Sequence, residues 1–252
     1  INPPYAEATN RGNIMLGDDT STKKGVASTK IAVFMKAYGK AGNELFTQFL
    51  ARIAQEMPTA TVAMFSTLKY VNAPNFEEFR HAWQAKYLGG FVVPSKAFEG
   101  LSGRFPIGFL VWKKKKKEIL REISVNVLDK NIHAIGEKSF YNLANNTFLN
   151  VWIKRQKANS HAVLPIKNAI SPATATPRVK TWSDNAIGYM HCGVNDLQHA
   201  EQETTLYSSV FSAGNGFYIT PENLWQAAVV FSVRRLIEPT WLNDRDQFLQ
   251  PN

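Results

Sequence analysis

The sequence is poor in cysteine and in acidic residues. Cys192 is the only cysteine among 252 residues, which excludes an internal disulfide framework and a zinc site built from several cysteines. Every apolar run is too short to span a membrane, and no basic segment is followed by the apolar stretch of a secretory signal. We therefore expect a protein of the reducing cytoplasm.

Basic residues outnumber acidic ones by 29 to 20, so the formal net charge is +9. This excess favours a polyanionic partner, because each phosphate that a Lys or Arg neutralises releases a counterion. The chain is otherwise 44% hydrophobic and 19% charged, which is typical of a globular protein with one large or two modest domains. Charge alone does not distinguish nucleic-acid-binding proteins from other basic proteins.

The first five residues, Ile1-Asn2-Pro3-Pro4-Tyr5, combine an amide, two prolines and an aromatic ring. Each proline fixes its own φ and lacks an N–H, so the carbonyls of this stretch are stiffly held. The Asn2 side chain adds an acceptor, and Tyr5 offers a ring on which a flat molecule can stack. The pattern favours binding of a planar molecule that carries an amino group; a proline-rich tail without a role is the alternative.

Asn-Pro-Pro-Tyr also resembles the catalytic motif of S-adenosylmethionine-dependent amino-methyltransferases, above all the DNA adenine-N6 methyltransferases of restriction-modification systems. The resemblance implies that the motif follows the fourth strand of a seven-stranded class I (Rossmann-like) sheet. It assigns Asn2, Pro3, Pro4 and Tyr5 to the catalytic site and makes Asn2 also a cofactor contact. The Asn2 side chain and the Pro3 carbonyl would accept both N–H groups of the target amine, and Tyr5 would stack on a flipped-out base.

The residues that follow alternate between helical and strand patterns. Apolar spacing predicts a short helix over 28–38, broken by Gly39 and Gly42, and a second helix from an N-cap at Asn43 to Met57. The β-branched, apolar run 61–65 predicts a buried strand. Helix followed by buried strand is typical of an α/β fold with a parallel sheet.

The pattern then repeats and changes. Phe76 to Tyr87 predicts a helix that ends at Gly89-Gly90, and strands are predicted at 91–93 and 105–112. Two strands joined without a helix predict a hairpin. In the family that the motif resembles, the last two strands form such a hairpin with the final strand inserted antiparallel, so residues 1–113 resemble the second half of that sheet.

The same resemblance implies a substrate contact between these two strands. An aromatic residue there packs on the other side of the flipped base, and Phe98 is the best-placed match, with Phe105 second. Packing in the core is an equal alternative for each of the two residues.

The cofactor-binding half of the family pattern does not follow the motif. The glycine-rich loop and the acidic residue that hold S-adenosylmethionine are expected before Asn-Pro-Pro-Tyr, so we interpret the chain as the C-terminal catalytic part of a larger protein. The only substitute is Ser212 to Phe217, which contains Gly214-Asn215-Gly216. A lone Gly-x-Gly is a weak signal, and the pattern favours a hairpin turn over a cofactor loop.

The rest of the chain predicts an additional mixed α+β region. Lys113 to Lys117 predicts a solvated loop, with a phosphate contact as the alternative. Alternation over 119–127, a turn at Asp129-Lys130-Asn131 and a returning strand at 132–141 follow. We therefore expect a catalytic half-domain at 1–117 and a region that recognises the DNA target at 118–252.

Helices are predicted at 147–157 and 221–237, and the residues between 181 and 217 show no clear period. His191, Cys192, Asp196 and His199 are metal-ligand types, but their spacing matches no strong zinc pattern and favours a structural role.

The leading interpretation is an enzyme, a site-specific DNA (adenine-N6) methyltransferase that acts on double-stranded DNA with S-adenosylmethionine as the methyl donor. The reaction requires no metal, and this part alone is expected to be inactive. A glutamine or RNA amino-methyltransferase is an alternative, because it acts on the same kind of amino group. A second alternative is a methyltransferase remnant that binds nucleic acid without catalysis.

Overall fold

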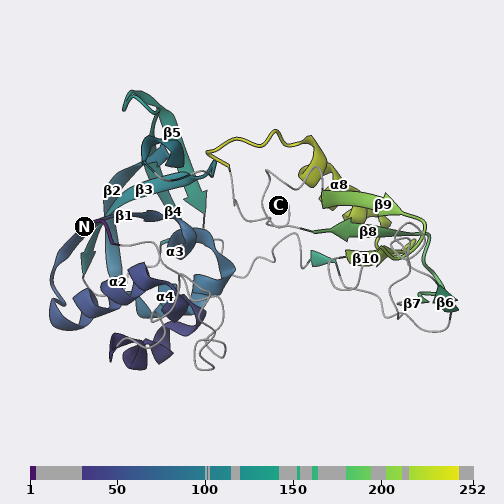
Figure 1. The fold of residues 1–252 in the computed structure, drawn as a ribbon, viewed down its shortest axis with the longest axis horizontal. Coiled ribbons are helices and arrows are strands. Elements are labelled where there is room, and N and C mark those ends of the chain that lie inside the picture. Colours follow the sequence, from purple (N-terminus) through teal and green to yellow (C-terminus); the bar gives the residue numbers. More distant parts are fainter. Residues whose placement is uncertain are drawn as a thin grey trace. The chain divides into compact units, whose positions relative to one another are not determined.

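The computed structural model describes residues 1–3, 30–99, 101, 103–114, 120–141, 152–153, 161–163, 180–193, 203–211 and 216–243. The chain forms two compact units, Ile1–Ala144 and Asn145–Asn252, each with its own mix of helices and strands (Figure 1). Among the helices of these described ranges, none is both long and apolar enough to cross a membrane.

A mixed five-stranded sheet organises the first unit, and its strands follow the order β1-β3-β2-β4-β5. Strand β3 is antiparallel to both β1 and β2, β4 runs parallel to β2, and β5 returns antiparallel to β4. The elements, in chain order, are η2 (Lys30–Asn43), α2 (Leu45–Glu56), β1 (Thr61–Thr67), α3 (Lys69–Asn72), η3 (Pro74–Phe76), α4 (Glu77–Ala82), β2 (Ala85–Pro94), η4 (Ser95–Ala97), β3 (Pro106–Lys114), β4 (Glu122–Leu128) and β5 (Ala134–Tyr141).

One face of β1, β3 and β4 is buried because these strands alternate between buried and more exposed residues. Val62, Met64 and Ser66 of β1 are buried while the residues between them are half-buried, and Met64 lies opposite Leu110 of β3. Burial of apolar surface is the main favourable term in folding, so this face supplies most of the sheet's stability.

Aromatic rings connect the helices to the sheet. Phe46 of α2 stacks on Phe76 with 5.9 Å between ring centroids, and Tyr70 of α3 meets Trp112 of β3 edge to face at 6.0 Å. Trp112 Nε1 also donates to the fully buried Tyr70 hydroxyl at 3.0 Å. The helices α2 and α3 are therefore anchored to β3 through a continuous aromatic core.

The predicted hairpin is confirmed, because β2 and β3 are adjacent and antiparallel. The helix predicted from Phe76 to Tyr87 is wrong in its second half, since α4 ends at Ala82 and β2 begins at Ala85. Pairing with the whole length of β3 extends β2, and a bulge at Leu88 beside Gly89, whose φ is 132°, accommodates the glycines within the strand.

The start of α2 also differs from the prediction. The N-cap position is occupied by Glu44 rather than by Asn43, and the Glu44 side chain makes no capping bond. The Thr47 hydroxyl instead donates to the Glu44 carbonyl at 2.7 Å. The predicted break at Gly39 is confirmed, because its φ of 55° lies in the left-handed region that glycine adopts without strain.

The first unit extends further than the expected 1–117 segment. The alternating segment predicted after residue 118 forms β4, and the predicted turn and returning strand form the hairpin with β5. Because β4 pairs with β2, this hairpin belongs to the first sheet and the division between units falls after Ala144.

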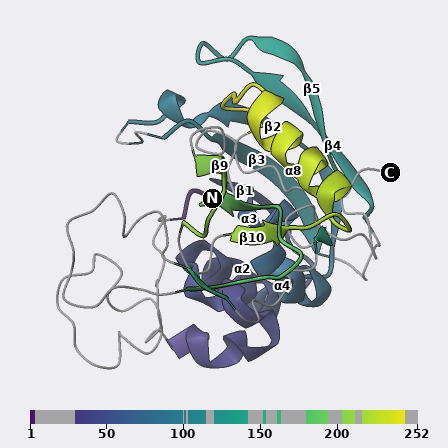
Figure 2. The same cartoon turned by 90° about the vertical axis from the view of Figure 1, so that its right-hand side faces the viewer.

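The second unit contains a three-stranded antiparallel sheet in the order β10-β8-β9 and a two-stranded ribbon of β6 and β7. The described strands are β6 (His161–Val163), β7 (Lys180–Trp182), β8 (Gly188–Cys192), β9 (Thr204–Tyr207) and β10 (Gly216–Ile219). The predicted helix at 221–237 is confirmed as α8 (Leu224–Leu236), drawn in yellow in Figure 2. Met190 and Ile219 from the sheet pack with Ala227 and Val230 of this helix. Of the helix predicted at 147–157, only residues 152–153 lie within the described residues.

Candidate functional site

The start of the chain adds a backbone segment to the edge of the first sheet. The Ile1 amino group donates to the Ala63 carbonyl, and the Phe65 N–H donates to the Ile1 carbonyl at 3.0 Å. Ile1 thus donates to the residue before Met64 and accepts from the residue after it. This is the hydrogen-bond pattern of parallel strands. The segment therefore runs parallel to β1 and toward its carboxyl end at Thr67.

Two of the four predicted catalytic residues lie within the described residues. The Asn2 side chain is exposed and Pro3 is buried, while Pro4 and Tyr5 lie outside the described residues. Asn2 and Pro3 follow Ile1 directly, so they lie along the carboxyl half of β1. In sheets with parallel strands, ligand sites form at the carboxyl ends of the strands.

Phe98, the first predicted substrate contact, is close to this segment. Its ring meets the ring of Phe65 edge to face, with 5.5 Å between centroids, and Phe65 is the residue whose N–H binds the Ile1 carbonyl. Phe98 is half-buried in the connection between β2 and β3. The fold thus brings residues from positions 1 and 98 into contact with the same residue, Phe65.

Phe65 belongs to a row of phenylalanines that the sequence analysis did not single out. Phe109 of β3 lies 4.6 Å from Phe65 and 5.3 Å from Phe91 of β2, measured between ring centroids. All three are half-buried on the face of the sheet opposite Met64. Each stands within a predicted strand, so pairing the strands in register would have revealed the row.

Ser95 fixes the shape of the connection that carries Phe98 and Phe105. Its Oγ donates to the Gly103 carbonyl at 2.6 Å and accepts from the Phe105 N–H at 3.3 Å. The Ser95 N–H donates to the Phe105 carbonyl at 2.9 Å, and the Ser95 carbonyl accepts from the Phe98 N–H at 3.0 Å. The fully buried Ser95 therefore fixes the backbone of both Phe98 and Phe105.

Phe105, the second predicted substrate contact, is half-buried just before β3. Its ring covers Gly103, where any side chain would collide with it. No ring contact joins it to Phe65 or Phe98 within the part of the chain that the structure describes, so Phe98 is the better placed of the two.

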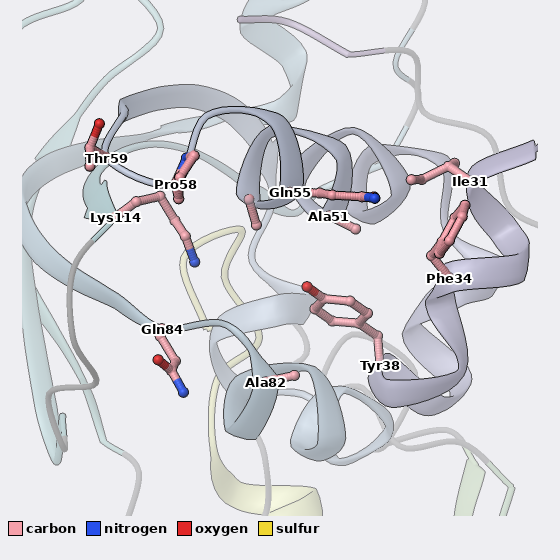
Figure 3. Close-up of a pocket in the computed structure, with 11 residues that line it drawn as sticks. Ile31, Phe34, Tyr38, Ala51, Gln55, Pro58, Thr59, Ala82, Gln84 and Lys114 are labelled. Carbon is pink, nitrogen blue, oxygen red and sulfur yellow. The ribbon is translucent and has the colours of Figure 1, made fainter.

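A cavity lies at the other end of β1. It is lined by Pro58 and Thr59, which precede β1, and by Lys114 at the end of the antiparallel β3 (Figure 3). The motif segment runs toward Thr67, so this cavity is separate from the site around Phe65.

The predicted solvated lysine loop begins later than expected. Lys113 and Lys114 belong to β3, and Lys114 is buried with its ammonium group 4.2 Å from the centroid of the Trp83 ring. The long aliphatic stem of lysine and the attraction between a cation and an indole face make this burial possible. Lys115 to Lys117 lie outside the described residues.

The candidate metal ligands of the second unit are only partly described. His191 is buried in β8 with its ring 5.1 Å from that of Phe211, and Cys192 follows it, while Asp196 and His199 lie outside the described residues. Among the described residues, no group of three or more His, Cys, Asp or Glu side chains is arranged to hold a metal ion.

The hairpin turn predicted for Gly214-Asn215-Gly216 is wrong. Strands β9 and β10 both pair with β8, on opposite sides, so the connection between them crosses from one edge of the sheet to the other. Gly214 and Asn215 lie outside the described residues, and Gly216 is the first residue of β10.

Comparison of the chain with protein-family models, with curated proteins and with solved structures found no match.

Proposed function

We propose that the chain is the catalytic half of an S-adenosylmethionine-dependent DNA (adenine-N6) methyltransferase with a class I, Rossmann-like sheet. The observation that carries this proposal is the position of the Asn-Pro-Pro-Tyr segment. It runs parallel to β1 at the sheet edge, and β3 is inserted antiparallel between β1 and β2. The resemblance of the motif implies this same arrangement for the last strands of the methyltransferase sheet.

The chemistry explains why an amide and a proline carbonyl are needed together. The lone pair of the adenine amino group is delocalised into the ring, so its nitrogen is a poor nucleophile until both N–H groups are held by acceptors. The Asn2 side-chain oxygen and the Pro3 carbonyl are the two acceptors, and neither bond requires a change of protonation. Phe98, whose ring contacts that of Phe65, would contact a base that has left the duplex.

Apart from Asn2, the described residues do not match the pattern that holds the methyl donor in the family that the motif resembles. Gly216 does not fit such a role, because a Cβ there would lie 2.5 Å from the Met190 carbonyl oxygen and 2.5 Å from the Tyr189 hydroxyl. A glycine is therefore required at this position for β10 to pack closely against β8. We assign cofactor binding to a preceding half of the same protein, as the order of the motif in the family implies.

Nucleic acid is the favoured substrate class over a protein glutamine. The net charge of +9 supports a polyanionic substrate, and a second compact unit follows the catalytic half. Double-stranded DNA is the partner for which the motif resemblance is greatest, and the second unit is the candidate for target recognition.

The test uses the intact gene product and its variants Asn2→Ala and Tyr5→Ala. Transfer of a labelled methyl group to double-stranded DNA should fall at least 100-fold in both variants, while DNA affinity at fixed salt stays within about twofold. Asn75→Ala, an exposed asparagine in η3, is the matched control and should leave both quantities unchanged.

Other results would assign a different function. Transfer to RNA or to a glutamine-containing polypeptide, but not to DNA, would replace the substrate class. An intact protein that binds DNA but neither binds S-adenosylmethionine nor transfers its methyl group would be a nucleic-acid-binding remnant. Equal losses of DNA affinity and methyl transfer in Asn2→Ala would contradict the catalytic role of the amide.

A further inference from the structure

A cavity of about 690 Å³ lies in the first unit between η2, α2 and the ends of α4 and β3 (Figure 3). This volume is within the range of small-molecule sites in proteins. The cavity lies at the amino-terminal end of β1, whereas the Asn-Pro-Pro-Tyr segment runs toward the carboxyl end of this strand, so the cavity has no part in the proposed methyl transfer. Its walls are mainly apolar, with Ile31 and Phe34 from η2 and Ala51 and Ala54 from α2.

Lys114 is the one charged side chain among the described residues that line this cavity, and Figure 3 shows its ammonium group pointing into it. Only 8% of Lys114 is exposed to solvent. Its ammonium group lies 4.2 Å from the centre of the Trp83 ring, which holds the side chain in place.

The Lys114 ammonium group has no charged partner among the described residues. Within the described ranges, no carboxylate lies within 4.0 Å of its ammonium group and no side-chain hydrogen bond satisfies it. Burial accordingly lowers the pKa of Lys114, since desolvation disfavours the charged form. The buried indole N–H of Trp83 also has no acceptor among the described residues. Buried cations are normally paired, so a ligand with an acceptor group would complete this site.

Tyr38 faces Lys114 from the opposite wall (Figure 3). Its ring packs on Phe79 with 5.5 Å between centroids, which orients the hydroxyl. The ordinary pKa of tyrosine already lies well above neutral, and burial raises the pKa of Tyr38 further, so its hydroxyl is a protonated donor at neutral pH. A single cation suits a single negative charge, because the other polar side chains that line the cavity, Tyr38, Gln55, Thr59 and Gln84, are neutral.

We propose that this cavity binds a small organic carboxylate with an apolar body. The carboxylate accepts from the Lys114 ammonium group and the Tyr38 hydroxyl, and the apolar body lies against Phe34 and the alanines of α2. A charge-assisted bond in a partly desolvated pocket provides selectivity for the anion over a neutral molecule of the same shape.

The test measures binding of octanoate and of octan-1-ol to the whole chain by isothermal titration calorimetry. Octanoate should bind at a single saturable site, at least tenfold more tightly than the alcohol. Lys114→Met keeps the length of the side chain but removes its charge, and should weaken octanoate at least tenfold while leaving octan-1-ol unchanged. Lys113→Met makes the same change of charge one residue away, and should have no effect on either probe.

A second variant tests the location independently of charge. Ala54→Phe fills the apolar part of the cavity, so both probes should lose affinity. Circular dichroism establishes that each variant is folded before titration. Equal octanoate affinity in the native chain and in Lys114→Met, absence of saturable octanoate binding, or undiminished binding of both probes to folded Ala54→Phe would each overturn the proposal.

Discussion

Replacing Ser95 by alanine should loosen the connection that carries Phe98 and Phe105. Its hydroxyl donates to the Gly103 carbonyl at 2.6 Å and accepts from the Phe105 N–H at 3.3 Å, and the residue is fully buried. Alanine retains the backbone bonds to Phe98 and Phe105 but leaves both of the hydroxyl's partners without it. The change therefore removes one short and one long hydrogen bond without creating a large cavity.

The expected loss is about 2 kcal/mol in the free energy of opening the β2–β3 connection. A neutral hydrogen bond contributes about 0.5–1.5 kcal/mol net, and a buried group left without a partner costs about 1–3 kcal/mol. The bond at 3.3 Å is long and adds little, so the short bond to Gly103 dominates. A change of about 2 kcal/mol corresponds to roughly a 30-fold larger population of open molecules.

Hydrogen exchange of the β3 amides measures this quantity without interference from the second unit. In Ser95→Ala these amides should exchange roughly 30-fold faster under conditions where exchange reports the opening equilibrium. Ser124→Ala is the matched control, because Ser124 is exposed on β4 and surface substitutions usually change stability by less than about 0.5 kcal/mol. Equal exchange rates in the two variants would refute the assigned role of the Ser95 hydroxyl.

Three further changes test the first unit. Tyr70→Phe removes the acceptor of the Trp112 indole N–H, and urea unfolding should show a loss of about 1–3 kcal/mol. Burial raises the pKa of Tyr87 to about 12, so the folded state holds this proton more tightly than the unfolded chain does. The free energy of unfolding should therefore fall as the pH rises from about 10 to 12, and Tyr87→Phe should reduce that fall. The backbone N–H groups of His133 and Asn131 donate to the Asp129 carboxylate and lower its pKa. The turn between β4 and β5 should therefore stay ordered above the ordinary carboxyl pKa and loosen as the pH falls through the lowered pKa. The amide NMR shifts of the turn would record this change.

Each of these expectations has a contradictory outcome. Unchanged stability of Tyr70→Phe relative to the exposed replacement Tyr141→Phe would mean that Trp112 finds another acceptor. An alkaline stability profile that is the same with and without Tyr87 would assign the loss to other tyrosines. If the NMR shifts of the turn amides change with a midpoint at the ordinary carboxyl pKa, the hydrogen bonds to Asp129 are not maintained in solution.

Much of the first sheet could be predicted because its strands are short apolar runs with recognisable breaks. The runs that contain Met64 and Leu110 alternate or remain apolar over strand length, and the absence of a helix between β2 and β3 was enough to predict their hairpin. Local pattern carries this information, since strand period and connection length are properties of neighbouring residues.

The sequence predicts a helix that continues beyond the end of α4, because Trp83 and Tyr87 are spaced four residues apart, as on one helical face. In the structure Trp83 ends the helix and Tyr87 belongs to β2, where its ring lies 5.1 Å from that of Trp112. The contact that decides between helix and strand comes from a residue distant in sequence, so the local apolar spacing does not reveal it. Tertiary pairing therefore overrode a local pattern.

The motif site was predicted in part for the same reason. The residue types at Asn2 and Pro3 indicate their chemistry directly, but Phe65 and Ser95 are ordinary residues whose importance comes from what lies beside them. Phe65 matters because it touches both the first segment and Phe98, and Ser95 because it joins two ends of one connection. Neither contact follows from composition or spacing.

The insertion of β3 between β1 and β2 has a consequence for how the chain acquires its structure. Until residues 106–114 are in place, β1 and β2 each present an unpaired edge, and the gap between them is one strand wide. A chain that stops before β3 during synthesis therefore exposes strand edges that can pair with strands of other molecules. Strand β3 pairs locally with β2 but pairs with β1 across residues that are distant in sequence, so the yield of native protein should depend on how soon β3 follows β2 out of the ribosome.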